Sequence, residues 1–175
     1  MQLEIETYES PLGSVVAALR DQRVCAMTFA DRWPQSERRL QRRFGALRCV
    51  PVPAGRLARC LDAYFGGDLT ALDALEVDPG GTPFQHAVWT ALSRVPAGET
   101  TSYGALARAI DAPAAVRAVG AANGANPVWL VIPCHRAIGS DGRLVGYAGG
   151  LDRKRWLLDH EGALSAQAPL AFASQ

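Results

Sequence analysis

The change from a strand-like to a helical pattern falls at residues 77–85, which read VDPGGTPFQ. Proline and glycine in succession end any regular element, so this stretch predicts a domain boundary close to its middle. It also offers a helix start, because Thr82 can cap a helix and Gln85 follows three residues later. We therefore expect an α+β protein, with an N-terminal α/β domain over residues 1–80 and a mostly helical domain over residues 81–175.

Upstream of this boundary the pattern is that of a sheet with helices. Residues 3–29 alternate apolar and polar side chains, with breaks at residues 10–13 and 21–22. Alternation interrupted by turn residues predicts a three-stranded antiparallel sheet. Amphipathic stripes at residues 34–45 and 55–66 predict two helices that cover one face of that sheet.

Downstream of the boundary the pattern is helical and is interrupted by short turns. An apolar run at residues 128–132, stopped by Pro133, predicts a buried strand. Two helices separated only by residues 111–112 form a helix-turn-helix candidate. Residues 164–175, rich in alanine and serine, predict a flexible tail. The helices are expected to start at Thr82, to cover residues 102–110 and 113–123, and to start again near Asp152.

The composition excludes several classes of protein. Of the 175 residues, 49% are apolar and the net charge is +1, which fits a globular chain and not a disordered one. Residues 81–160 carry 8 Lys+Arg against 5 Asp+Glu, a mild bias toward an anionic partner. Because no segment has the pattern of a signal peptide or a membrane span, we expect a cytoplasmic protein that does not contact a membrane.

The cysteines show no pairing pattern. Their spacings of 24, 11 and 74 residues include no Cys-x-x-Cys motif, which argues against both a disulfide framework and a zinc site. We therefore predict free thiols, no metal and no cofactor. The four are Cys25, Cys49, Cys60 and Cys134.

Cys134 is the candidate nucleophile because a histidine follows it directly. A neighbouring imidazole or positive charge raises the thiolate fraction of a cysteine. Neighbours on an extended chain point to opposite faces, so coupling of Cys134 to His135 requires a turn or a bridging water. Either His160 or Glu161 is then available to orient the imidazole. The alternative is that Cys134 is a small buried apolar residue beside a surface histidine.

The string Pro133-Cys134-His135-Arg136 follows Asn126-Pro127 and precedes the sequence GYAGG at residues 146–150. Together these motifs resemble the active-site signature of the O6-alkylguanine-DNA alkyltransferases, the methylated-DNA–protein-cysteine methyltransferases. The resemblance runs from Gly81 to Gly162, with the motifs in order and at family spacing. It implies a ribonuclease H-like N-terminal domain and a C-terminal domain with a winged helix-turn-helix-like DNA-binding motif.

The resemblance also implies a reaction and its residues. A methyl group passes directly and irreversibly from O6 of guanine, or O4 of thymine, to Cys134, once per molecule. His135 and Glu161 resemble the relay that withdraws the thiol proton through water. Tyr103 resembles the tyrosine that donates a hydrogen bond to the flipped base, and Asn126 the asparagine that braces the region around the cysteine.

The implied partner is double-stranded DNA that carries alkylated bases, bound by a monomer. Arg117 resembles the arginine that fills the gap left by the flipped base. The small side chains around it permit close approach to the minor groove, although about half of the alanines are expected only to pack against Leu106 and Ile110. DNA contacts are expected from Arg117, Ala118, Gly120, Ala121 and Arg136, and the wall of the base pocket from Tyr147, Ala148 and Gly149.

Two other functions fit the sequence less well. A lesion-sensing DNA binder that does not react would have no need of Cys134. A hydrolase or redox sensor built on Cys134 lacks an oxyanion motif and a nearby second cysteine. A further departure concerns the helix expected at residues 113–123: Ala112 stands where relatives often have a capping asparagine, so Asp111 is the substitute cap.

Overall fold

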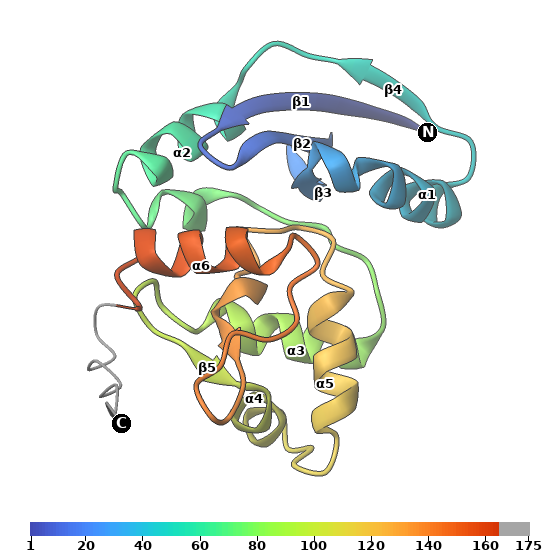
Figure 1. Cartoon of the computed structure of the whole chain (residues 1–175). Helices are drawn as coiled ribbons and strands as arrows, with labels where there is room; N and C mark the ends of the chain where they lie inside the picture. Colours follow the sequence, from blue (N-terminus) through green and yellow to red (C-terminus); the bar gives the residue numbers. More distant parts are fainter. Residues whose placement is uncertain (165–175) are drawn as a thin grey trace.

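The computed structural model describes residues 1–164, so nearly all of the tail predicted at residues 164–175 lies outside the described part. The N-terminal half contains a four-stranded sheet in the order β3-β2-β1-β4 (Figure 1). The strands are β1 (Gln2–Ser10), β2 (Gly13–Arg20), β3 (Arg23–Phe29) and β4 (Arg48–Pro51).

The first three strands form the predicted antiparallel meander, but the sheet has one strand more than the sequence indicated. The fourth strand, β4, pairs in parallel with β1, so that Leu3 lies opposite Cys49. Its four residues are mostly exposed and carry no alternation. A short edge strand of this kind leaves no period-two signal, which explains why the pattern missed it.

Helices α1 (Trp33–Phe44) and α2 (Arg56–Phe65) cover opposite faces of the sheet, which corrects the expectation of a single covered face. Leu40 of α1 packs in one cluster with Ala18 of β2, whereas Leu61 of α2 belongs to the cluster that contains Ala17. Neighbouring residues of a strand point to opposite faces, so the two helices cannot share one.

The other helices belong to the C-terminal half. The predicted capping box is confirmed: the backbone N–H of Gln85 donates to Thr82 Oγ1 at 3.3 Å, and the N–H of Thr82 donates to Gln85 Oε1 at 2.9 Å. The helices are α3 (Pro83–Ser93), α4 (Tyr103–Ala109), α5 (Val116–Gly124) and α6 (Leu151–His160). The short elements are 3-10 turns η1 (Ala30–Arg32), η2 (Ala71–Ala74) and η3 (Cys134–Arg136), and the paired strands β5 (Thr101–Ser102) and β6 (Ala137–Ile138).

Helix α5 begins later than predicted. Its N-cap is Ala115, which makes no side-chain capping bond, so the helix starts at Val116 and not at residue 113. Asp111 has a backbone φ of 56° and does not cap the helix. The turn between α4 and α5 is correspondingly longer than two residues.

The strand predicted at residues 128–132 is absent from the structure. Val128 forms one isolated parallel bridge with Met27, and the chain then turns tightly through Leu130, whose φ is 70°. The side chain of Asn126 causes the turn, because it accepts a bond from the N–H of Val128 at 2.9 Å and donates one to the carbonyl of Ile132 at 2.8 Å. Local side-chain bonds of this kind replace the ladder bonds of a strand.

The two halves share one apolar core. The main cluster joins residues of the sheet, such as Met27, to Leu61 of α2, Trp89 of α3 and Leu157 of α6. The helices α3, α5 and α6 lie together on one side of the sheet (Figure 1). Among the described residues no helix has both the length and the apolar character required to cross a membrane.

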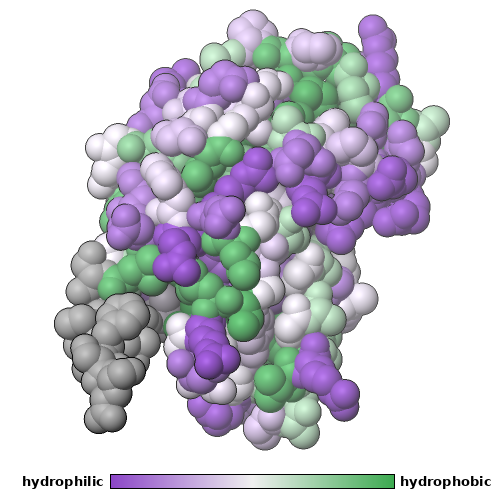
Figure 2. Space-filling view, viewed as in Figure 1, coloured by the Kyte–Doolittle hydropathy of each residue, from purple (hydrophilic) through white to green (hydrophobic). Residues whose placement is uncertain are grey.

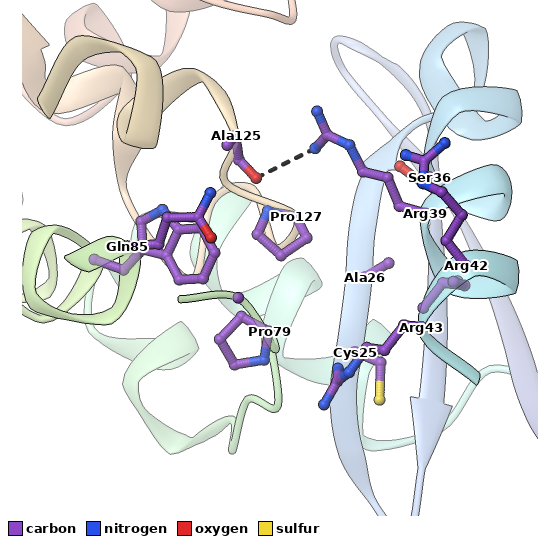
Figure 3. Close-up of a pocket in the computed structure, with 13 residues that line it drawn as sticks. Cys25, Ala26, Ser36, Arg39, Arg42, Arg43, Pro79, Gln85, Ala125 and Pro127 are labelled. Carbon is purple, nitrogen blue, oxygen red and sulfur yellow. Dashed lines mark hydrogen bonds between the residues drawn. The ribbon is translucent and has the colours of Figure 1, made fainter. Parts of the chain in front are cut away.

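A groove of about 410 Å³ runs between α1 and the C-terminal half (Figure 3). Arg39 of α1 bridges it, because its guanidinium donates a hydrogen bond to the carbonyl of Ala125 at 3.2 Å. On the outer surface hydrophilic side chains gather over α1, which carries four exposed arginines (Figure 2). They are Arg38, Arg39, Arg42 and Arg43.

Candidate active site

Cys134 lies at the first position of the 3-10 turn η3, directly after Pro133. Its backbone N–H donates to the carbonyl of Ile132 at 2.8 Å, and its own carbonyl accepts a bond from Asn123 Nδ2 at 3.4 Å. Only 3% of the residue is exposed. The turn therefore holds the thiol at a fixed place just below the surface. Because the turn is helical, Cys134 and His135 do not point to opposite faces as they would on an extended chain.

The thiol of Cys134 is protonated at rest. Burial raises its pKa to about 11, although a hydrogen bond from Asn126 and the charge of Lys154 act in the opposite direction. A thiol is a weak nucleophile compared with a thiolate. If Cys134 acts as the predicted nucleophile, a base must therefore remove this proton.

His135 has the geometry of such a base. Its Nε2 lies 2.9 Å from Oε1 of Glu161, and both side chains are fully buried. Since a carboxylate only accepts, Nε2 carries the proton of the neutral imidazole and Nδ1 has a free lone pair. Within residues 1–164, Nδ1 has no hydrogen-bond partner. Burial lowers the pKa of His135, so the ring is neutral and able to accept a proton.

Glu161, at the C-terminal end of α6, holds the imidazole through a dense set of bonds. Arg136 Nη2 donates to Oε1 and Arg136 Nε to Oε2, each at 2.9 Å, and the hydroxyl of Tyr64 donates to Oε1 at 2.7 Å. Burial alone would raise the pKa of Glu161, but the bonds and charges of His135 and Arg136 outweigh it and hold the pKa well below its usual range. The carboxylate is therefore ionised near neutral pH.

The side chain of Arg136 faces inward. It is about 10% exposed and bonds Glu161 and the carbonyl of Val95, the latter at 2.6 Å. The predicted contact of Arg136 with DNA stays a prediction, which these bonds do not support. Of the two candidates to orient His135, the structure selects Glu161, because His160 bonds the backbone carbonyl of Tyr64.

Tyr103, the first residue of α4, lies near Cys134. Its hydroxyl lies 3.4 Å from the carbonyl of Val145 and 3.3 Å from that of Gly146. Burial and the proximity of Cys134 raise the pKa of Tyr103, so the phenol is a donor. On the other side, Cδ1 of its ring lies 4.0 Å from the position that a Cβ at Gly120 of α5 would occupy.

The loop at residues 145–150 passes close to His135. The ring centroid of Tyr147 lies 6.4 Å from that of His135 and 5.6 Å from that of Trp129. The buried hydroxyl of Tyr147 has no partner within the described residues. A Cβ at Gly149 would lie 2.6 Å from the Tyr147 ring, so this position requires glycine. Ala148 is exposed.

Sequence reasoning missed Lys154 of α6. Its side chain is fully buried, and Nζ donates to the carbonyls of Ala137 and Val145 at 2.5 and 2.6 Å. Burial lowers the pKa of Lys154 to about 8. The helical spacing could have predicted this burial. Lys154 precedes Leu157 and Leu158 by three and four residues, so it lies on the same buried stripe of α6.

Helix α5 separates into a buried face and an exposed face. Val119, Ala122 and Asn123 are buried, and Trp89 Nε1 donates to the carbonyl of Ala122 at 2.9 Å. The predicted DNA-contact residues lie outside this buried set. Arg117, Ala118 and Ala121 are exposed and Gly120 is half-buried. Ala122 fits the alternative that an alanine of this helix only packs in the core.

Comparison with known proteins gives consistent matches. A family model described as "6-O-methylguanine DNA methyltransferase, DNA binding domain" matches residues 83–163. The methylated-DNA–protein-cysteine methyltransferase of Salmonella typhimurium is 45% identical over 168 residues, which cover 94% of this chain and 98% of the relative. The protein of the same name from Mycobacterium bovis is 56% identical over 101 residues, which cover 58% of this chain and 61% of the relative.

Solved structures agree with these matches. The crystal structure of Mycobacterium tuberculosis OGT in complex with DNA superposes with a TM-score of 0.79 at 39% identity, over 91% of this chain and 93% of that one. The O6-methylguanine-DNA methyltransferase of Pyrococcus kodakaraensis gives 0.72 at 28% identity, over 91% and 99%. The mixed α+β fold is therefore that of a DNA repair methyltransferase. The chain belongs to the methylated-DNA–protein-cysteine methyltransferase family.

Proposed function

We propose that this chain repairs DNA by moving a methyl group from O6 of guanine, and from O4 of thymine, directly onto Sγ of Cys134. The observation that carries the proposal is the arrangement of a buried thiol on η3 next to His135. Nε2 of His135 is held by Glu161, while Nδ1 has no partner among residues 1–164. The three residues form a nucleophile, a base and a group that orients the base.

The reaction begins with the proton of Cys134. It passes through a water molecule to Nδ1 of His135, and the ionised carboxylate of Glu161 stabilises the imidazolium that forms. The thiolate then attacks the methyl carbon in line. The S–C bond forms as the bond between the methyl carbon and O6 breaks, and the electron pair of that bond leaves with the base.

The departing guanine carries negative charge, which Tyr103 stabilises by donating a hydrogen bond before the base takes up a proton from solvent. The loop that contains Tyr147, Ala148 and Gly149 forms the wall of the base pocket. The buried hydroxyl of Tyr147 has no partner in the described part of the chain. This supports the assignment, because a ligand in the pocket could provide the missing partner.

A base inside a duplex is covered by stacking and pairing, so it must rotate out of the helix at a cost of about a few kcal/mol. Arg117 projects from the exposed face of α5 and fills the gap. The adjacent Ala118, Gly120 and Ala121 let the backbone of α5 approach the minor groove. The proximity of the Tyr103 ring to Gly120, 4.0 Å from the position of a Cβ there, supports a location of this helix next to the reactive centre.

The product determines the turnover number. A thioether has no good leaving group, so the methyl group stays on Cys134 and each molecule acts once. The protein needs no metal or cofactor for this step, because the thiolate and the alkylated base supply all the reacting atoms.

The same proposal includes the fold and role of each domain. The N-terminal domain, residues 1–80, is ribonuclease H-like, and residues 81–175 form the DNA-binding and alkyl-acceptor domain. In this second domain α4 and α5 constitute a winged helix-turn-helix-like motif, which the packing of α4 on α5 supports. The protein acts as a monomer.

The test is mass spectrometry of the full chain after incubation with a duplex that contains O6-methylguanine. We expect a mass gain of one methyl group in place of hydrogen, located on Cys134, and no gain for Cys134→Ser. Cys60→Ser, which removes a half-buried thiol elsewhere, should react normally. Modification of another residue, or binding of the duplex without any transfer, would refute the proposal and favour a lesion-sensing binder.

A further inference from the structure

The N-terminal half reaches the reactive centre through one side chain. Tyr64 of α2 donates its hydroxyl proton to Oε1 of Glu161 at 2.7 Å, across a sequence separation of 97 residues. Tyr64 is 1% exposed and the carboxylate of Glu161 is fully buried. Burial and the charge of Glu161 raise the pKa of Tyr64, so the phenol is a permanent donor. The bond is therefore a fixed element of the site.

We propose that Tyr64 is a positioning residue of the proton relay: its hydroxyl fixes the carboxylate of Glu161 and limits how strongly that carboxylate holds the proton of His135. This inference rests on the proposed function and deepens it. It assigns the N-terminal half a part in the reaction beyond support of the fold.

Several donors bond a single oxygen atom of Glu161. Oε1 accepts from Tyr64 at 2.7 Å, from His135 at 2.9 Å and from Arg136 at 2.9 Å. Three donors share the lone pairs and negative charge of one atom, so each weakens the bond that the others make. Loss of the Tyr64 hydroxyl should therefore strengthen the bond between Glu161 and His135 and raise the basicity of the imidazole.

A more basic imidazole impairs the relay in two ways. It becomes protonated at a higher pH, where its Nδ1 can no longer accept the proton of the thiol. The carboxylate also loses one of its four bonds, which loosens the orientation of the ring that the relay needs. The acid limb of the pH–rate profile should then move toward higher pH.

The other charged and titratable groups around the imidazole remain when only the phenol hydroxyl is removed. Arg136 and Lys154 face His135 and lower its pKa, whereas Glu161 raises it. Tyr147 packs on its ring from the loop at residues 145–150. None of these groups belongs to α2. A shift of the acid limb in a Tyr64 variant can therefore be assigned to the lost hydroxyl.

The experiment compares Tyr64→Phe with Tyr8→Phe. Tyr8 also donates its hydroxyl to a carboxylate, that of Asp62 at 2.8 Å, but on the exposed side of α2. Both variants keep their rings and lose one hydroxyl. We expect Tyr64→Phe to move the acid limb of single-turnover methyl transfer upward by about one pH unit, and to slow transfer near neutral pH several-fold. Tyr8→Phe should have the wild-type profile.

A Tyr64→Phe profile that coincides with the wild type, with only the melting temperature lowered, would show that Tyr64 merely packs and would overturn the proposal. A second measurement does not depend on methyl transfer or on the folding of a variant. In NMR of the unmodified chain, the proton chemical shift of the Tyr64 hydroxyl, which itself stays protonated, should change with pH at the same midpoint as the nitrogen-15 shifts of the His135 ring. Independent midpoints would also overturn the proposal, whereas a chain that titrates as expected but accepts no methyl group would refute only the proposed function.

Discussion

The surroundings of Glu161 and the exposed face of α5 differ in burial and in hydrogen bonding. Around Glu161 every polar partner is buried and bonded, with four hydrogen bonds from three side chains. The exposed face of α5 carries small side chains and one cation, Arg117. The proposed chemical centre is thus organised without DNA, while the proposed recognition surface would become occupied only when a duplex docks.

This difference predicts how the two regions respond to substitution. Groups in the buried network are coupled, so the removal of one leaves others without partners and lowers stability together with activity. An exposed side chain on α5 has few partners to lose, so its removal should affect only reactions with DNA. The predictions below test this distinction, beginning with the largest effect.

Glu161→Gln should abolish most of the activity and destabilise the fold. The amide cannot balance the buried guanidinium of Arg136 or stabilise the imidazolium of His135. We expect methyl transfer to slow by about 10²–10⁴-fold and the free energy of unfolding to fall by about 3–5 kcal/mol. Urea denaturation and single-turnover assays measure both effects. Glu99→Gln, at an exposed position, is the control and should change neither.

The same carboxylate gives the protein an acid-sensitive stability. The pKa of Glu161 is lower in the folded chain than its unfolded value of about 4.3. The folded state therefore gains stability from it above that pH and loses this contribution as the pH falls further. The stability difference between wild type and Glu161→Gln should accordingly shrink below about pH 4. A difference that stays constant with pH would show that the carboxylate is not the source.

Arg117→Ala should separate recognition from chemistry. Without a side chain to fill the gap left by the extruded base, transfer from a methylated duplex should slow by about 10- to 100-fold. The free energy of unfolding should change by no more than about 0.5 kcal/mol, because the residue is exposed. Arg59→Ala, which removes an exposed cation from α2, controls for general charge. Equal losses in both variants would contradict a specific role for Arg117.

Methylation of Cys134 should lower the stability of the fold by less than Glu161→Gln does. The residue is 3% exposed, and an added carbon in a packed site costs about 1–3 kcal/mol. For a chain of this length each kcal/mol corresponds to a fall in melting temperature of about 2–4 °C. Differential scanning calorimetry before and after reaction measures the shift, and Cys134→Ser treated with the same duplex should show none. An unchanged melting temperature in the methylated protein would mean that the site has spare volume.

The site residues differ in how well the sequence indicated them. Cys134 and His135 stand in a short string, and Glu161 follows at a spacing that the family motif fixes. Arg136 belongs to the same string, but the string did not indicate its bonds to Glu161 and Val95, because it does not say which side of the turn each side chain faces. Lys154 was overlooked, since a lysine in a helix with many charges is typical of a solvated position.

The elements of the fold also differ in how well the sequence indicated them. The alternation of residues 3–29 and the capping box at Thr82 are local patterns, and the structure contains both. The edge strand β4 and the turn in place of a strand at residues 128–132 depend on pairing with β1 and on the side chain of Asn126. A pattern along the chain does not encode such partners.

The sequence by itself indicated the candidate nucleophile, its adjacent candidate base and the class of chemistry, because these depend on residue type and short spacing. Only the tertiary structure decided that Tyr64 meets Glu161, that Arg136 turns inward and that Lys154 is buried. The physical reason is that hydrogen bonds between distant residues form only after α2 and α6 pack into the shared core, and that packing decides which polar groups lose water and must find partners.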